Sequence, residues 1–160
     1  MKILLAADGS PFTQVAARHL VNHLKWFAKP PEVHLFHVHP SLPYPGAAAV
    51  VGKAALEKYQ REESEAALSV AVKELAAAGV SHTSSWEVGD VAVQLGRYVK
   101  EHGIDLVVMG THGHGALANL ALGSVATKCI ATLEVPIMIV RVSPLSKPLA
   151  KRGRGDSRRS

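Results

Sequence analysis

The 160-residue sequence has little of several things that usually define a protein class. A single cysteine, Cys129, cannot form an internal disulfide, which agrees with a reducing compartment, and its place in an expected helix predicts a buried thiol. No apolar run approaches the roughly 18 residues of a membrane span. Met1-Lys2 leads directly into an expected strand rather than into a signal peptide. We therefore expect a cytoplasmic protein without a membrane partner.

Outside the C-terminal end, the chain also has no excess of either positive or negative charge. The net charge of +5 arises from Pro144 onward, where six basic residues (Lys147, Lys151, Arg152, Arg154, Arg158, Arg159) face one acid, Asp156, while the rest balances at twelve against twelve. Without apolar periodicity, this end is expected to be a disordered tail (144–160) on a single domain (1–143). Nucleic acid is not an expected partner; the alternative, a basic arm on nucleic acid or an anionic surface, predicts salt-sensitive affinity.

Apolar runs of strand length alternate with helical patterns along the chain, which is typical of βα units in a mostly parallel sheet. Strands are expected at Lys2–Asp8, Val33–His39, Val80–Val88, Ile104–Met109 and Val135–Val142. Helices are expected at about Pro11–Phe27, Lys53–Ala78, Asp90–His102 and Val125–Leu133. With 48% apolar residues, these elements can bury one sizeable core. The pattern predicts an α/β fold.

Local signals support several of these boundaries. Ser10 before Pro11 predicts an N-cap with proline at the first helical position, and Gly103 predicts a helix end. The third strand contains few apolar residues and is expected at a sheet edge. The long helix has apolar residues at broadly helical spacing, which predicts its buried face: Leu56, Tyr59, Ala67, Val70, Ala71 and Leu75.

The stretch most indicative of function is Gly110-Thr111-His112-Gly113, directly after the apolar run of the fourth strand. Glycines at the carboxyl end of a buried strand allow a sharp turn that presents N–H groups to an anion. Gly123-Ser124 opens the next helix, whose first-turn N–H groups and macrodipole would face the same anion. The sequence therefore predicts a phosphate loop with a nucleotide as its ligand.

Each of these residues also has a structural interpretation. Asp8, which ends the first strand, is either a ligand contact or a turn and capping residue. Gly110 and Gly113 are either phosphate-loop or ordinary turn glycines, and Ser124 can serve as a plain N-cap.

Histidines at i, i+2 spacing, His37 with His39 and His112 with His114, raise the question of a metal site. A structural zinc site usually takes four ligands, and one helical cysteine does not complete such a set, so we expect no metal. His112 is more interesting as a hydrogen-bond donor to phosphate.

Three segments resemble the universal stress protein family: MKILLAADGS (1–10), DLVVMGTHGHGALANLALGS (105–124) and VPIMIV (135–140). The nucleotide-binding branch of that family carries Gly, two residues, Gly, nine residues, then Gly followed by Ser or Thr. Gly110, Gly113, Gly123 and Ser124 fit this fingerprint without a gap. The resemblance covers essentially Met1 to Val142. It implies a single-domain, Rossmann-like, open five-stranded parallel sheet of order 3-2-1-4-5 with helices on both faces.

The resemblance also implies three groups of contacts to ATP. The adenosine end would be contacted by Asp8 and by the main chains of Ala7 and Val38. The ribose and first phosphates would be surrounded by Met109, Gly110, His112 and Gly113. The outer phosphates would accept hydrogen bonds from Gly123, Ser124 and Val125.

The function implied is an ATP-binding stress-response module, with or without Mg²⁺, that acts as a homodimer through the strand at 135–142 and signals to an unknown protein partner. No Walker-type Gly-Lys-Ser/Thr pair is present and no feature places Lys128, so hydrolysis is expected to be slow or absent, with no catalytic residue assigned. One alternative is a binder of AMP or a cyclic nucleotide. Another is a nucleotide-hydrolysing or nucleotidyl-transferring enzyme on the same fold, against which the lack of HIGH-like and SGGxDS-like motifs counts.

Overall fold

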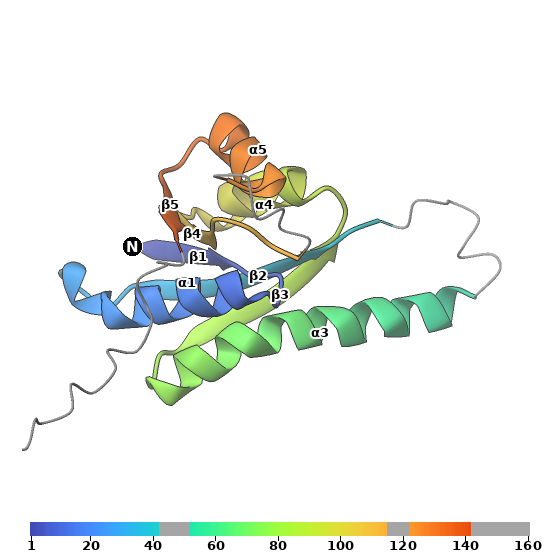
Figure 1. Ribbon diagram of the computed structural model, residues 1–160, viewed down its shortest axis with the longest axis horizontal. Coiled ribbons are helices and arrows are strands. Elements are labelled where there is room, and N and C mark those ends of the chain that lie inside the picture. The colour runs from blue at the N-terminus through green and yellow to red at the C-terminus, as the bar shows by residue number, and fades with distance from the viewer. Residues whose placement is uncertain (42–51, 115–121, 142–160) are drawn as a thin grey trace, which may run out of the picture.

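The computed structural model describes residues 1–41, 52–114 and 122–141 (Figure 1). The expected tail and most of the proline-rich segment after Pro40 lie outside these residues. The strands are β1 (Lys2–Ala6), β2 (Glu32–His39), β3 (His82–Val88), β4 (Leu106–Gly110) and β5 (Ile137–Val140). The helices are α1 (Pro11–Asn22), the short 3₁₀ helix η1 (Leu24–Trp26), α3 (Lys53–Ala77), α4 (Val91–His102) and α5 (Ser124–Thr132).

The five strands form one parallel sheet in the order β3-β2-β1-β4-β5. In register, Leu4 of β1 lies between His34 of β2 and Val107 of β4. The central strands are buried on both faces, as their continuous apolar sequences require. The predicted strand order and the predicted edge position of β3 are confirmed.

Helices cover both faces of the sheet (Figure 1). On one face α1 and α3 pack against alternate strand residues such as Ile3 and Leu5, and on the other α4 and α5 pack against Leu4 and Val107. Alternation along a strand sends neighbouring residues to opposite faces, so two hydrophobic clusters form, one on each side of the sheet. Among the described residues, no helix is both long and apolar enough to cross a membrane.

The caps predicted from the sequence are present. The Ser10 hydroxyl accepts a hydrogen bond from the Thr13 amide at the start of α1, with Pro11 at the first helical position. Asp90 caps α4 by accepting from the Val93 amide at 3.1 Å, and Gly103 ends that helix in the left-handed conformation.

Several expected boundaries were wrong. Strand β1 ends at Ala6 rather than at Asp8. Helix α1 ends at Asn22 rather than near Phe27, because the His23 amide donates to the Leu20 carbonyl three residues earlier, and this tighter turn leads into η1. Strand β5 is shorter than expected. Pro136 has no N–H, and only its carbonyl joins the sheet, by accepting from the Val107 amide at 3.0 Å.

The buried face predicted for the long helix was also wrong in part. Of the six residues expected there, Ala71 and Leu75 are buried, together with Ser64 and Leu68, which the pattern did not select. Tyr59 is 51% exposed because the beginning of α3 extends past the end of the sheet (Figure 1), where its ring contacts only the edge of the His39 ring among the described aromatic side chains.

Candidate functional site

A cavity of about 580 Å³ lies at the carboxyl ends of β1, β2 and β4, next to the beginning of α5. This is the point at which the strand order reverses, between β1 and β4, where open α/β sheets characteristically bind ligands. We call it the switch-point cleft. The structure brings all ten predicted site residues to its wall: Ala7, Asp8, Val38, Met109, Gly110, His112, Gly113, Gly123, Ser124 and Val125.

Backbone hydrogen bonds of Thr111 hold the glycine loop, Gly110 to Gly113, against β5 and against the start of α5. The Thr111 amide donates to the Val140 carbonyl at 3.1 Å, and the Thr111 carbonyl accepts from the Gly123 amide at 2.8 Å. A Cβ atom at Gly110 would lie 2.6 Å from Cβ of Phe12, and one at Gly123 would lie 3.1 Å from the Thr111 carbonyl oxygen. Gly110 is therefore required by close packing of protein against protein, whether or not a ligand is bound, and a side chain at Gly123 would need the Thr111 carbonyl to move by a few tenths of an ångström.

Helix α5 begins without a side-chain cap. Its N-cap is Gly123, and Ser124 is the first helical residue, so the alternative of Ser124 as a plain N-cap was wrong. The first intrahelical bond of this turn runs from the Thr127 amide to the Gly123 carbonyl at 3.0 Å. The amides of Ser124, Val125 and Ala126 have no acceptor within the helix, and all three residues line the cleft. The positive end of the helix dipole thus faces the cavity.

Asp8 connects the two loops that border the cleft. Its Oδ1 accepts from the Ser10 amide at 3.0 Å and from the Thr13 hydroxyl at 2.7 Å, and its Oδ2 accepts from the His114 amide at 3.1 Å. Burial raises the pKa of Asp8, but the hydrogen bonds from Ser10, Thr13 and His114 together outweigh it and hold the pKa below the ordinary value. The capping interpretation of Asp8 is therefore present in the structure, and Oδ2 retains acceptor capacity toward the cleft.

Gly113 makes this arrangement possible. A Cβ atom at this position would overlap Oδ2 of Asp8. The φ angle of Gly113 is not in the left-handed region, so the requirement for glycine is one of space rather than of backbone conformation. The sequence predicted this glycine as part of a phosphate loop, and the structure adds a contact within the protein.

The far end of the cleft is apolar. Val38 and Met109 are 7% and 6% exposed and present their side chains to it beside Leu95. The main-chain groups of Ala7 both have protein partners: its amide donates to the Phe36 carbonyl at 2.9 Å, and its carbonyl accepts from Nδ1 of His37 at 2.7 Å. Ala7 therefore offers a ligand little more than its methyl group and one remaining lone pair. Burial is the largest influence on His37 and lowers its pKa.

Among the described residues that line the cleft there is no lysine or arginine. Lys128 extends instead to Asp90, with Nζ 2.6 Å from Oδ2, and joins α5 to the start of α4. His112 lies beside Phe12, with ring centroids 5.3 Å apart. Within the part of the chain that the structure describes, no three His, Cys, Asp or Glu side chains gather as metal ligands.

Sequence reasoning missed several residues of the cleft, among them Thr13, His37 as a wall residue and His114 through its amide, and it missed Phe12, which lies against Gly110. The sequence offered a weak signal for Thr13, which lies in the turn that Asp8 starts. It offered none for Phe12, whose contact with Gly110 is formed only by packing of α1 on β4.

The fold and the site together define a doubly wound α/β protein with a cleft at its switch point that the N-terminus of α5 faces. The chain belongs to the universal stress protein family, whose model matches residues 1–141. It is 32% identical over 141 residues to the universal stress protein MJ0531 of Methanocaldococcus jannaschii, covering 88% of this chain and 81% of that protein.

Solved structures show the same architecture. The protein MJ0577 superposes with a TM-score of 0.72 at 26% identity, over 89% of this chain and 96% of that one. A universal stress protein family member from Arabidopsis thaliana with AMP bound superposes with a TM-score of 0.64 at 16% identity, over 90% of this chain and 93% of that one.

Proposed function

We propose that the protein binds an adenine nucleotide in the switch-point cleft. The observation that carries the proposal is the uncapped N-terminus of α5, whose first-turn amides line the same cavity as the glycine loop. Free amides and the positive end of a helix dipole attract phosphate, and the apolar wall at Val38 and Met109 suits a base. The AMP held by the family member from Arabidopsis supports an adenine nucleotide as the ligand class.

The nucleotide that we propose is ATP. Its adenosine end would lie against Ala7, Asp8 and Val38, and its ribose and first phosphate beside Met109, Gly110, His112 and Gly113. The outer phosphates would then reach the amides of Gly123, Ser124 and Val125 and the Ser124 hydroxyl. The Gly123 amide already donates to Thr111, so the bonds to phosphate fall mainly to the residues after it.

The cleft offers little to a magnesium ion. Asp8 is the one carboxylate among the lining residues that the structure describes, and its two oxygens already accept three hydrogen bonds. Protein-held Mg²⁺ usually takes one or two carboxylates beside the phosphates. These residues therefore do not fit a resident magnesium site.

We further propose that hydrolysis is slow or absent and that the protein acts as a homodimeric signalling module. The described lining has no lysine or arginine to stabilise charge on a transferring phosphoryl group. Strand β5 is a sheet edge, and its residues Ile137, Met138 and Ile139 are only half-buried. A second copy paired along β5 would cover these side chains and the unpaired backbone.

The test is calorimetric titration of ATP, AMP and cyclic AMP into the wild type and two variants, after release of any co-purified nucleotide by denaturation. Ser124→Pro removes the amide donor together with the hydroxyl, and proline is favoured at the first helical position. Gly123, at φ −72° and ψ 158°, already has the extended conformation required before proline. The matched control, Ser124→Ala, removes only the hydroxyl.

Relative to Ser124→Ala, we expect Ser124→Pro to weaken ATP binding about tenfold, the effect of losing one charge-assisted hydrogen bond, and to leave AMP binding nearly unchanged. Equal ATP affinity in the wild type and Ser124→Pro would contradict the placement of the phosphates. Binding of AMP or cyclic AMP without ATP would establish the alternative function instead.

A further inference from the structure

Two histidines and a tryptophan gather at the C-terminal end of α1, and we call them the α1 aromatic cluster: His19, His23 and Trp26. The ring centroids of His19 and His23 lie 4.1 Å apart, and those of His23 and Trp26 are also 4.1 Å apart. The spacing i, i+4 places the two histidines on one face of the helix. The 3₁₀ turn of η1 then brings Trp26 back to them, since the Trp26 amide donates to the His23 carbonyl at 2.9 Å.

The α1 aromatic cluster lies on the surface, away from the switch-point cleft. His19 and His23 are half-buried, and Trp26 is 58% exposed. Helix α1 runs antiparallel to β1, so its last turn lies at the amino ends of the strands, whereas the cleft lies at their carboxyl ends (Figure 1). A ligand at the cluster would therefore not touch the nucleotide site, and the inference below does not depend on nucleotide binding.

One hydrogen bond fixes the tautomer of His23. Its Nδ1 lies 2.7 Å from the His19 carbonyl oxygen, which can only accept, so Nδ1 carries the proton. In the neutral ring, Nε2 then presents a lone pair. Histidines that bind metal ions almost always donate their other ring N–H to a backbone carbonyl, a carboxylate or water, which orients the ring. His23 is oriented in this way.

His19 supplies a second lone pair. Its ring nitrogens make no hydrogen bond within the part of the chain that the structure describes. Burial, followed by the neighbouring charge of His23, lowers the pKa of His19, so its imidazole is neutral at neutral pH. Two protonated rings this close would repel each other, whereas two neutral rings offer two lone pairs to one cation.

The separation of the two rings is close to that required by a shared metal ion. An ion about 2.1 Å from two imidazole nitrogens holds the ring centroids about 4.5 Å apart when its two bonds are at right angles. The ring planes are inclined by 32°, so the His19 ring must turn about its Cβ–Cγ bond until its plane contains the same ion. That torsion is broad, and the hydrogen bond to the backbone holds the other ring, so the turn costs little.

From these observations we propose that His19 and His23 together bind a divalent late transition-metal ion, with Cu²⁺ bound more tightly than Ni²⁺ or Zn²⁺. Imidazole suits all three ions, and affinity for a nitrogen site is highest at copper. Two protein ligands leave the other positions to water, so this is an open surface site, and it differs from the groups of three or more ligands that the described residues do not form. Mg²⁺ and Ca²⁺ prefer oxygen ligands and should not bind.

Trp26 provides the readout, because Cu²⁺ quenches the fluorescence of an adjacent indole. The chain has two tryptophans, so the titration uses the full chain with Trp86→Phe, at about pH 7.5 where imidazole is neutral. We expect saturable quenching at one Cu²⁺ per chain, and recovery of the fluorescence with excess Zn²⁺. His19→Gln and His23→Gln should each weaken Cu²⁺ binding about tenfold or more, because one imidazole replaces two.

The matched control is His82→Gln, which should bind Cu²⁺ as the parent does. Nδ1 of His82 also lies near a local backbone carbonyl, that of Val80 at 3.1 Å, but no second histidine contacts its ring among the described residues. Equal weakening in His82→Gln, an unchanged midpoint of quenching in both variants of the pair, or equal quenching by Mg²⁺ would overturn the proposal. So would a lack of saturation below about 1 mM Cu²⁺.

A second measurement separates a metal site from an aromatic cluster that only stabilises the end of the helix. Electron paramagnetic resonance of the chain with both tryptophans intact, at one equivalent of Cu²⁺, should show coupling to nitrogens of two imidazoles. The same spectrum of His19→Gln or His23→Gln should show coupling to one. Identical spectra for the wild type and both variants would place the copper elsewhere and overturn the proposal.

Discussion

Replacing Gly113 by alanine tests whether this glycine serves the protein or the ligand. The added Cβ would overlap Oδ2 of Asp8, so the carboxylate must move or the loop must shift. Because the φ angle of Gly113 is ordinary for an L-residue, the substitution carries no penalty from backbone conformation. Any destabilisation of the ligand-free protein therefore reports the contact with Asp8.

The magnitude follows from the hydrogen bonds that Asp8 accepts. Displacing Oδ2 alone breaks the bond from the His114 amide and costs about 1.5 kcal/mol, the lower value for a bond to a charged group in a part-buried setting. Expelling the whole carboxylate also breaks the bonds from Ser10 and Thr13, for a total of about 4.5 kcal/mol. Reduced freedom of the unfolded chain returns about 0.5 kcal/mol. We expect Gly113→Ala to lower the free energy of unfolding by about 1 to 4 kcal/mol.

The assay is urea unfolding followed by circular dichroism for the wild type, Gly113→Ala, Asp8→Ala and the double variant. In the Asp8→Ala background the overlapping oxygen is gone, so Gly113→Ala should be nearly neutral and the coupling free energy should equal most of the single-variant loss. The control is Gly96→Ala in α4, where the added Cβ lies 3.5 Å from Leu133 in ordinary contact and should stabilise the helix. Equal losses from Gly113→Ala in both backgrounds would refute the steric argument.

Three further predictions follow from named groups. Burial raises the pKa of Asp8, but its hydrogen bonds lower that pKa by more, so the folded pKa lies below the unfolded one. The stabilisation from Asp8 is therefore present above the unfolded pKa and is lost as pH falls through the folded pKa. Asp8→Asn should flatten the fall in unfolding free energy below about pH 4, and the same pH dependence in wild type and variant, measured by urea unfolding, would count against this. Burial, followed by the charge of Asp90, raises the pKa of the Cys129 thiol to about 11. A thiol reagent at about pH 8 should therefore label Cys129 no faster than the protein unfolds, and rapid stoichiometric labelling would be inconsistent with a buried thiol. Ile139→Lys should give a monomer with an unchanged circular dichroism spectrum, and a dimer in sedimentation would rule out pairing through β5.

The sequence predicted the sheet well because its signals are local. Continuous apolar runs mark strands buried on both faces, and Ser10, Asp90 and Gly103 each act within a few residues of their own position. The buried face of α3 was harder to predict. Alanines on several sides of that helix blur its apolar stripe, and how far it extends beyond the sheet depends on the length of the strands beneath it.

The residues of the cleft likewise include some that local sequence signals predict and others whose contacts depend on residues far away in the chain. Strand ends and glycines predicted that Asp8 and the glycine loop gather there, since parallel strands place their carboxyl ends together, whereas Ala7, Val38 and Met109 were expected there from the family resemblance. The bond between Asp8 and the His114 amide spans 106 positions, and the space that Phe12 takes from Gly110 exists only after α1 has packed. The cavity between β3 and α4 was not anticipated, because the polar residues of β3 indicated an edge strand and gave no sign of what lies across from them.

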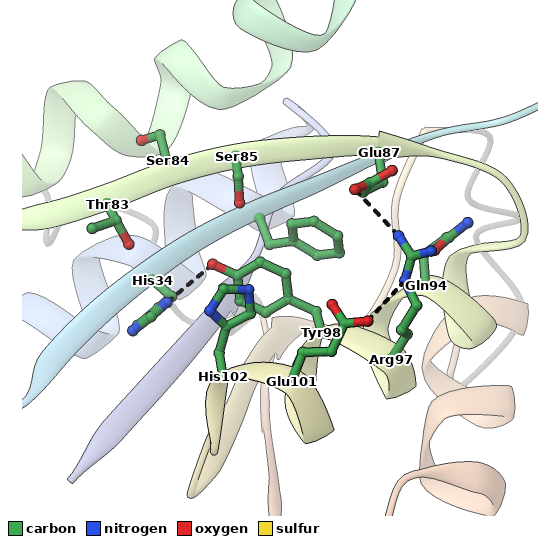
Figure 2. Close-up of a pocket in the computed structure, with 11 residues that line it drawn as sticks. His34, Thr83, Ser84, Ser85, Glu87, Gln94, Arg97, Tyr98, Glu101 and His102 are labelled. Atoms are coloured by element: carbon green, nitrogen blue, oxygen red, sulfur yellow. Dashed lines mark hydrogen bonds and ion pairs between the residues drawn. The ribbon is translucent and has the colours of Figure 1, made fainter.

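Helix α4 and the ring of Phe36 border two cavities. Val91 and Leu95 face the switch-point cleft, while Gln94 and Tyr98 face a cavity of about 300 Å³ between α4 and β3 (Figure 2), and Phe36 stacks on Tyr98 with ring centroids 4.3 Å apart. Any movement of α4 on the side of the cleft must therefore also repack the side chains on the other side of the same helix.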